Sequence, residues 1–210
     1  MKWKTWSLGL EILKRVKDSN LGIRYFFDIY RKREELAGSM KVGKQGIELI
    51  KHFEGLHDGD LRKIGLQPKE CPAGIWTIGY GRALKDEKGE WLKGPEGFKK
   101  LLKLYPHFET ITEEKAVQFL EEDLNEYGER VKSLNLPLSQ HEFDALVSFS
   151  YNVGFGALQR STLLKRIQSR EGNIEEAFMM WVKGGGKTLP GLVRRRKAEA
   201  TLFLTGKLEL

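Results

Sequence analysis

Apolar residues recur at helical spacing in two stripes within the first 37 residues. A polar, glycine-containing break at residues 19–22 separates the two stripes. This pattern predicts a helix, a turn and a second helix, each with one apolar face. The stripes consist of Trp6, Leu10, Leu13 and Val16, and then of Ile23, Phe26, Phe27 and Tyr30.

From residue 41 onward the pattern is mostly helical, with one interruption. Apolar residues line one face of a predicted helix that ends near Glu54, and these residues are Ile47, Leu49, Ile50 and Phe53. Residues 56–84 are rich in glycine and turn residues and contain one alternating stretch. We therefore expect a small β-region there, followed by a short helix over residues 95–104.

The later helices are marked by their capping residues. Thr112 precedes a long helix with two glutamates in its first turn, as the helix dipole favours. Ser139 and Glu142 have the spacing of a capping box. Further helices are predicted over residues 160–169, 174–183 (ended by the glycines at 184–186) and 190–205, the last capped by Gly206. Together the elements predict an α+β fold that is mainly helical.

The net charge indicates a polyanionic partner but does not identify which kind. The 210 residues carry a formal net charge of +7, and +4 of this lies in the first 40 residues. A basic surface favours polyanions, which include nucleic acid, anionic lipid and the acidic bacterial envelope. Charge is the only feature that points to nucleic acid, and we expect no nucleic-acid partner.

Cysteine content and hydropathy exclude several classes of protein. Cys71 is the only cysteine, so no intramolecular disulfide can form, and no Cys/His cluster predicts a metal site. No apolar run approaches the roughly 20 residues that span a bilayer. Charged residues also interrupt the only stretch that could form a cleavable signal, namely Glu11, Lys14, Arg15 and Lys17. We expect a protein made and folded in a reducing cytoplasm.

The pattern divides the chain into a basic amphipathic segment (residues 1–37), a junction (38–40) and a larger domain (41–210). The junction reads Gly38-Ser39-Met40. It is either an ordinary loop or the scar of a fusion in which Met40 starts the second protein. Both interpretations stay open at the level of sequence.

Two short segments bring together side chains suited to hydrolysis. Phe53-Glu54-Gly55 places a carboxyl at the end of a helix, beside a glycine where the backbone can turn away. Residues 71–81, CPAGIWTIGYG, predict a tight turn and then a strand on which Thr77 faces opposite to Trp76. Cleavage of a glycosidic bond needs an acid at the leaving oxygen and a group that positions water on the other face of the sugar. Taken singly, these residues could equally be a surface glutamate and a strand threonine.

Taken together, the two segments resemble the active-site region of the bacteriophage-type lysozymes, or endolysins. The resemblance covers residues 41–206 and does not extend to residues 1–37. It implies a two-lobed fold with a small β-hairpin lobe and a larger helical lobe. It also implies hydrolysis, without metal or cofactor, of the β-1,4 bond between N-acetylmuramic acid and N-acetylglucosamine, with inversion by direct attack of water.

The resemblance also assigns roles to residues. It implies Glu54 as general acid, Cys71 as the second catalytic position and Thr77, six residues further on, as the group that orients water. A free thiol is mostly neutral at pH 7, so Cys71 would act as a base only with a lowered pKa and otherwise by hydrogen bonding.

One departure from the family pattern keeps alternatives open. Sixteen residues, 55–70, separate Glu54 from Cys71, which is more than the family usually has. This longer interval could leave the site intact. It also supplies three carboxylates that could fill the second catalytic position instead of the thiol: Asp58, Asp60 and Glu70.

The family pattern further suggests three substrate-binding residues. These are Tyr80 in the hairpin segment, Asn152 in the sequence SYNVG, and Arg195 in the sequence GLVRRR. The resemblance implies that an arginine of the last segment pairs with Glu54. Counting back from the end of the predicted helix favours Arg195, with Arg194 as the alternative.

These features predict an endolysin that acts on peptidoglycan glycan strands. We expect a monomer that resides in the host cytoplasm until holin-type release to the cell wall. The alternative is a non-catalytic glycan-binding or regulatory module on the same fold. For residues 1–37 three interpretations remain: contact with an anionic membrane, packing on the domain or a protein partner, or no separate role.

Overall fold

The computed structural model describes residues 39–56, 58–59, 65–71 and 73–210. Internal contacts divide the chain between Met40 and Lys41, and the described helices and strands lie in the second unit, Lys41–Leu210. The two helices predicted within residues 1–37 lie outside the described residues, as does Asp60. In the described part of the chain, no helix is both long enough and apolar enough to cross a bilayer.

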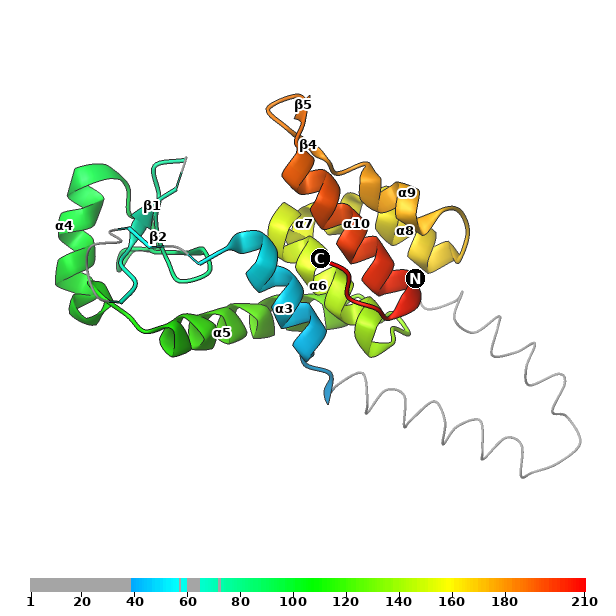
Figure 1. Ribbon diagram of the computed structural model, residues 1–210, viewed down its shortest axis with the longest axis horizontal. Coiled ribbons are helices and arrows are strands. Elements are labelled where there is room, and N and C mark those ends of the chain that lie inside the picture. Colours follow the sequence, from blue (N-terminus) through cyan, green and yellow to red (C-terminus); the bar gives the residue numbers. More distant parts are fainter. Residues whose placement is uncertain (1–38, 57, 60–64, 72) are drawn as a thin grey trace, which may run out of the picture. The chain divides into compact units, whose positions relative to one another are not determined.

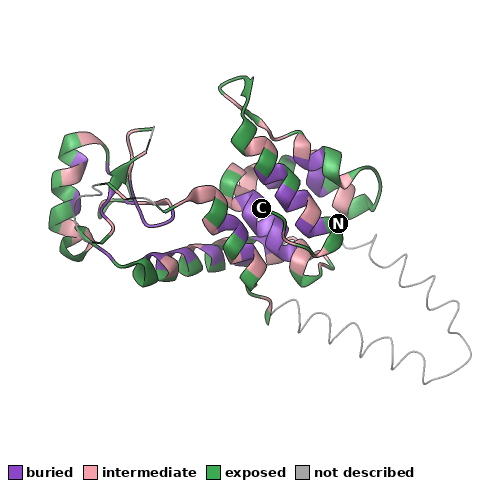
Figure 2. Cartoon of the chain, viewed as in Figure 1, coloured by how far each residue is buried: buried purple, intermediate pink, exposed green. Residues whose placement is uncertain are grey.

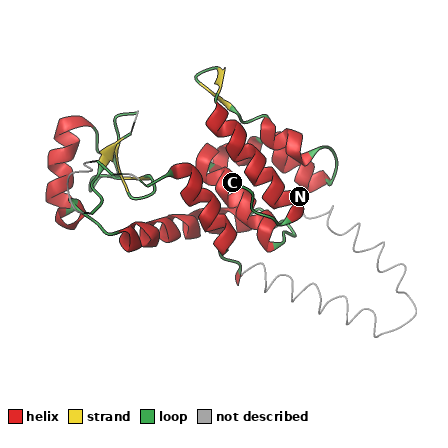
Figure 3. Cartoon of the chain, viewed as in Figure 1, coloured by secondary structure: helices red, strands yellow, loops and turns green. Residues whose placement is uncertain are grey.

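Helices dominate this unit, and a small antiparallel sheet accompanies them (Figures 1 and 3). The mainly helical α+β fold predicted from the sequence is therefore confirmed. In chain order the elements are α3 (Lys44–Glu54), β1 (Lys69–Glu70), β2 (Trp76–Ile78), β3 (Arg82–Ala83), α4 (Gly94–Leu104), the 3-10 turn η1 (Pro106–Phe108), α5 (Glu113–Lys132), α6 (Gln140–Val153), α7 (Phe155–Arg160), α8 (Thr162–Ser169), α9 (Ile174–Met179), β4 (Lys183–Gly184), β5 (Lys187–Thr188) and α10 (Pro190–Thr205).

Helix α6 forms the centre of the helical part. Eight consecutive residues, Phe143–Ser150, are buried, so neighbours cover the helix on every side (Figure 2). It packs against α3, α5 and α10. The predicted capping box begins it: the hydroxyl of Ser139 accepts from the Glu142 amide, and the Glu142 carboxylate accepts from the Ser139 amide. Sequence thus fixes where the central helix starts.

The start of α3 is tied to α6 by a buried carboxylate. Gly43, which precedes α3, offers no side-chain cap, but its amide donates to Asp144 Oδ1 on α6 at 2.8 Å. Gln140 Nε2 donates to the same oxygen at 2.8 Å. Because Asp144 satisfies an amide at the helix terminus, it fixes the end of α3 that lies opposite Glu54.

The small sheet has the strand order β1-β2-β3, with Thr77 opposite Lys69 on one side and Ala83 on the other. A tight turn joins β1 to β2, in which the Gly74 amide donates to the Cys71 carbonyl at 2.8 Å. Helix α4 covers the sheet through Phe98, whose ring centre lies 4.6 Å from that of Trp76. The predicted β-region is therefore a three-stranded sheet.

Helix α5 connects the sheet to the helical part and contacts β3, α6 and α7 (Figure 1). Thr112 caps it as predicted, with its hydroxyl accepting from the Lys115 amide at 3.2 Å. Arg82 of β3 donates to both carboxylate oxygens of Asp123 and to the Phe119 carbonyl. This bidentate ion pair, which fixes the orientation of both side chains, holds the sheet to α5.

In the region 155–188 one prediction was wrong in detail and one helix was missed. The predicted helix over 174–183 ends at Met179, and residues 183–188 form the hairpin β4–β5. Gly185 and Gly186 both have positive φ, 56° and 79°, which suits a two-residue hairpin turn rather than a helix end. The separate short helix α7 was not predicted. The last helix and its left-handed cap at Gly206 (φ 71°) agree with the prediction.

The packing of the sheet on α5 can be tested at Gly79. This residue has φ 63°, and an added Cβ would lie 3.0 Å from the Cβ and 3.2 Å from the Cα of Ala116. Gly79→Ala should therefore combine left-handed strain of about 1–2 kcal/mol with overpacking of about 1–3 kcal/mol. The free energy of unfolding from urea titration measures the loss. Gly89→Ala is the matched control because Gly89 has φ 81° but open space around it, so it should show the strain alone. Equal losses in the two variants would contradict the close packing on Ala116.

Candidate active site

Glu54 is the last residue of α3, and Gly55 turns the chain away immediately after it. Gly55 has φ 67°, a conformation that glycine adopts without strain. The Glu54 side chain is 21% exposed, so the carboxyl is mostly covered yet reachable. The local sequence Phe53-Glu54-Gly55 therefore presents a carboxyl at a helix end, as its pattern predicts.

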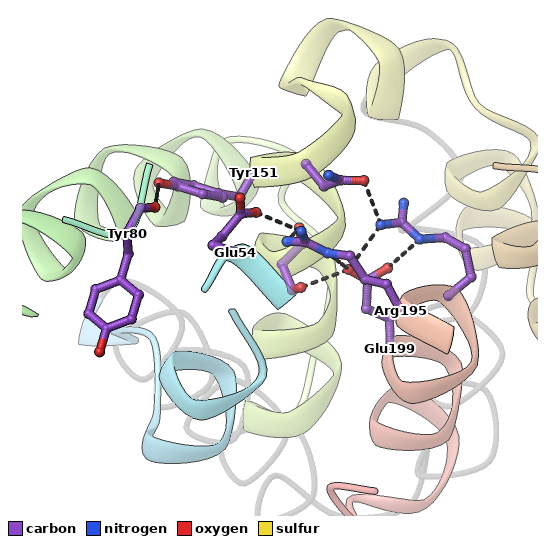
Figure 4. A network of polar contacts seen from close by, with 8 residues as sticks. Glu54, Tyr80, Tyr151, Arg195 and Glu199 are labelled. Carbon is purple, nitrogen blue, oxygen red and sulfur yellow. Dashed lines mark hydrogen bonds and ion pairs between the residues drawn. The ribbon is translucent and has the colours of Figure 1, made fainter. Parts of the chain in front are cut away.

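Arg195 of α10 holds the Glu54 carboxyl. Its Nη1 lies 2.6 Å from Glu54 Oε1, and the Arg195 side chain is only 4% exposed (Figure 4). The neighbouring Arg194 is exposed. The structure thus confirms the predicted pairing and selects Arg195 over Arg194. A short charge-assisted hydrogen bond of this kind fixes the orientation of both groups.

Behind Arg195 lies a buried carboxylate that sequence reasoning did not single out, Glu199. Its Oε1 accepts from Ser148 Oγ at 2.7 Å, from Arg195 Nε at 3.1 Å and from Arg196 Nη2 at 3.3 Å (Figure 4). Burial raises the pKa of the Glu199 carboxyl, while Arg196, Arg195 and Ser148 oppose that rise. Burial likewise lowers the pKa of the Arg196 guanidinium. The sequence does place arginines 195 and 196 one turn before this glutamate, but the same spacing is typical of solvent-exposed pairs and does not predict burial.

Tyr151 of α6 lies beside Glu54 (Figure 4). Its hydroxyl donates to the Tyr80 carbonyl at 3.4 Å, and its ring meets that of Tyr127 edge-on at 5.2 Å. Burial raises the pKa of the Tyr151 phenol, and the negative charges of Asp123 and Glu54 add to this effect. The phenol therefore stays neutral and provides a fixed wall next to the carboxyl.

Tyr80 joins this region through its backbone, and its phenol points away from Glu54 (Figure 4). The ring is buried and the hydroxyl donates to Glu113 Oε1 of α5 at 3.0 Å. Lys51 Nζ lies 5.1 Å from the ring centre and 3.6 Å from Glu113 Oε1. These contacts link the sheet segment to α5 and α3. A sugar contact by Tyr80 stays a prediction, and these contacts do not support it.

Cys71 and Thr77 belong to the same hairpin. Cys71 begins the turn between β1 and β2, its amide donates to the Ile75 carbonyl at 2.8 Å, and its thiol is free and partly exposed. Thr77 lies on the middle strand, where it is buried and its hydroxyl donates to the Lys69 carbonyl at 2.9 Å. The predicted hairpin geometry is therefore present. The catalytic roles of both residues stay predictions.

The longer interval before Cys71 places its described carboxylates in local contacts. Glu70 lies on β1, and its Oε1 accepts from the Gly94 amide at the start of α4 at 3.1 Å. Asp58 Oδ1 accepts from the Gln67 amide at 3.5 Å. Both carboxylates are thus engaged within the sheet region. Neither contact tests a catalytic role.

Asn152 lies near the end of α6 and is exposed. Its Oδ1 accepts from Arg196 Nη2 at 2.8 Å, so the carboxamide is held by the same buried cluster that holds Arg195. Of the predicted site residues, Glu54, Asn152 and Arg195 are thereby joined in one hydrogen-bonded network. Among the described residues, no group of three His, Cys, Asp or Glu side chains could hold a metal ion.

Comparison with known proteins assigns this arrangement to a family. Residues 51–199 match the family model of the phage lysozymes. The chain belongs to the phage lysozyme family. An endolysin of Bacillus phage B103 is 41% identical over 172 residues, which are 80% of this chain and 56% of that relative. An endolysin of Acyrthosiphon pisum secondary endosymbiont phage 1 is 33% identical over 170 residues, 78% of this chain and 98% of that relative.

Solved structures agree with the family assignment. The muramidase domain of SpmX from Asticaccaulis excentricus is 34% identical, with a TM-score of 0.59, and the match covers 79% of this chain and 99% of that domain. The fold is therefore that of the phage lysozymes, which are a family of glycoside hydrolases. The chain spans only about half the length of the Bacillus phage relative, but nearly all of the aphid endosymbiont phage endolysin.

The ion pair at Glu54 predicts a large difference in stability between substitutions of two adjacent arginines of α10. Arg195→Gln removes a buried partner of both Glu54 and Glu199 and should lower the free energy of unfolding by about 3 kcal/mol, because it leaves buried charge uncompensated. Arg194→Gln changes an exposed residue of the same helix and should cost less than about 0.5 kcal/mol. Chemical denaturation of the two variants measures both values. Similar losses would argue against the buried pair as a structural element.

Proposed function

We propose that this chain is a peptidoglycan hydrolase that cleaves the β-1,4 bond between N-acetylmuramic acid and N-acetylglucosamine. The observation that carries the proposal is the mostly covered Glu54 carboxyl, held by Arg195, in a chain of the phage lysozyme family. The names of the relatives, endolysin and muramidase, support the same activity.

In the proposed mechanism Glu54 is the general acid. It protonates the oxygen of the leaving sugar and becomes a carboxylate in the same step. Arg195, 2.6 Å away, then stabilises the new negative charge. In the resting protein Glu54 and Arg195 form an ion pair, so Glu54 takes up a proton from solvent, which removes this pairing, before it acts as the acid. Transfer of that proton to the leaving oxygen restores the ion pair, and the pairing therefore favours the transition state over the bound substrate.

Water attacks the anomeric carbon from the opposite face as the bond to the leaving oxygen breaks, the surplus proton of the water passes to solvent, and the configuration inverts. We assign the placement of this water to the hairpin, with Thr77 orienting it and Cys71 in the second catalytic position. Because the Thr77 hydroxyl donates its proton to the Lys69 carbonyl, it would meet this water as an acceptor. In this position Cys71 acts by hydrogen bonding to the water.

The alternative is a glycan-binding or regulatory module without catalysis. The sixteen-residue interval between Glu54 and Cys71 favours it, because a displaced hairpin would leave Glu54 without a partner group. Synthesis in the host cytoplasm followed by holin-type release, and membrane or protein contact through residues 1–37, remain part of the proposal for the whole chain.

Replacement of Glu54 tests the proposed chemistry. Glu54→Gln keeps the size of the side chain but cannot donate the carboxylic proton, so the rate of peptidoglycan clearing should fall by roughly 100-fold or more. The measurement is the loss of turbidity of a purified cell-wall suspension. Glu48→Gln, on an exposed position of the same helix, should clear it at the wild-type rate. Clearing by Glu54→Gln at the rate of the control would refute the assignment, and binding without clearing by the wild type would favour the alternative module.

The second catalytic position can be assigned by comparing the thiol with its rivals. If Cys71 positions the water, Cys71→Ala should reduce the clearing rate by about 10-fold or more, and Cys71→Ser should keep part of it. Asp58→Asn, Asp60→Asn and Glu70→Gln should then each stay near the wild-type rate. The same turbidity assay with matched circular dichroism spectra measures this. A wild-type rate for both Cys71 variants, with a loss in one carboxylate variant, would move the role to that carboxylate.

A further inference from the structure

Glu199 is a fully buried carboxylate that takes no part in the proposed chemistry. It lies on α10, one turn after Arg195 and Arg196, and its side chain has no exposure. Removing a carboxylate from water is costly unless it gains both opposite charge and hydrogen bonds. Here two guanidinium groups and the Ser148 hydroxyl provide them. A charge kept at such cost, directly behind a candidate active site, calls for a functional explanation.

The two arginines that share Glu199 lead to different side chains of the candidate site. Arg195 uses Nε for Glu199 and Nη1 for Glu54, at 3.1 and 2.6 Å. Arg196 uses Nη2 for both Glu199 and Asn152, at 3.3 and 2.8 Å, and its Nε lies 3.0 Å from Glu199 Oε2. Because a guanidinium is planar, fixing one edge fixes the direction of the other.

We propose that Glu199 is a positioning residue that sets two site groups at once, Glu54 through Arg195 and Asn152 through Arg196. The inference rests on the proposed function. Since Arg196 occupies the carbonyl oxygen of Asn152, the amide nitrogen is the part of that side chain left to meet a ligand. Asn152 then acts as a donor and recognises an acceptor on the glycan, such as the carbonyl oxygen of an acetamido group.

The electrostatics of the cluster explain why a charge, and not only a hydrogen bond, is needed. Arg195 and Arg196 are adjacent and both buried, and Arg195 contributes to the lowered pKa of Arg196. Glu199 lies between them and offsets their repulsion. A neutral amide at this position would leave two buried cations facing the single carboxylate of Glu54, and both guanidinium groups would lose their fixed direction.

The test compares Glu199→Gln with wild type on a soluble tetrasaccharide of alternating N-acetylglucosamine and N-acetylmuramic acid, using the full chain. The connection from Glu199 through Arg195 to Glu54 is called the Glu54 arm, and the one through Arg196 to Asn152 the Asn152 arm. We expect kcat to fall about 10-fold or more through the Glu54 arm and KM to rise about threefold through the Asn152 arm. Leu202→Ala, a buried apolar change one turn further along α10, is the control for lost stability. It should unfold more easily yet keep both constants.

Double variants show whether the effect passes through the two arginine arms. With Arg195→Gln already present, Glu199→Gln should lower kcat by less than about twofold more, and with Asn152→Ala present it should no longer raise KM. Fully additive effects would overturn the proposal, and so would wild-type constants in a folded Glu199→Gln protein. Should that variant fail to fold, Ser148→Ala removes one donor to the same carboxylate and should lower kcat about threefold. An unchanged kcat there overturns the proposal too.

Failure of this inference and failure of the proposed function give different results. Hydrolysis that Glu54→Gln abolishes but Glu199→Gln leaves intact refutes only the positioning role. A wild type that does not cleave the tetrasaccharide refutes the proposed function. The Asn152 arm is then decided by calorimetry of tetrasaccharide binding, where Glu199→Gln should weaken the affinity about threefold. Unchanged affinity, or no binding by the wild type, overturns the positioning role as well.

Discussion

The ion pair between Glu54 and Arg195 is the contact on which the candidate site depends. It joins residues that are 141 positions apart and links the end of α3 to the middle of α10. Arg195 is buried, so its charge has to be met inside the protein, and only carboxylates at fixed places can do this. Glu54 on one side and Glu199 on the other meet it. The position of the proposed acid therefore follows from the charge balance of the helical core.

Buried polar contacts also explain why neighbouring helices cover α6 so completely. Its polar residues form hydrogen bonds with neighbouring helices. Asp144 accepts from the Gly43 amide at the start of α3, and the Ser148 hydroxyl donates to Glu199 of α10. Its apolar residues fill the space between, as when the Phe149 ring meets Phe178 edge-on at 5.5 Å. Helix α3 is thus fixed at its first turn by Asp144 and at its last residue by Arg195. Because the helix that carries Glu54 is held at both ends, the Glu54 carboxyl loses little freedom when a substrate binds.

Local signals made much of this predictable from sequence, and long-range pairing set the limit. Thr112, Ser139 and Gly206 act within one helical turn, so their caps could be read directly from neighbouring residues. The glycines at 184–186 were ambiguous, because the same residues can end a helix or turn a hairpin, and strand pairing decided the outcome. Glu199 was missed since its burial depends on α6, and a glutamate at helical spacing from arginines normally indicates a solvent-exposed pair.

Backbone pairing among the described residues sets the internal geometry of the hairpin that carries Cys71 and Thr77. Leu66 exchanges two hydrogen bonds with Ile111, at 2.8 and 2.9 Å, just ahead of α5. From that point the register of β1 with β2 is set by Lys69 opposite Thr77, and the sheet is fastened to α5 through Arg82. The relation between Cys71 and Thr77 is set by the turn and the pairing, and the relation of the hairpin to the helices is set by α5.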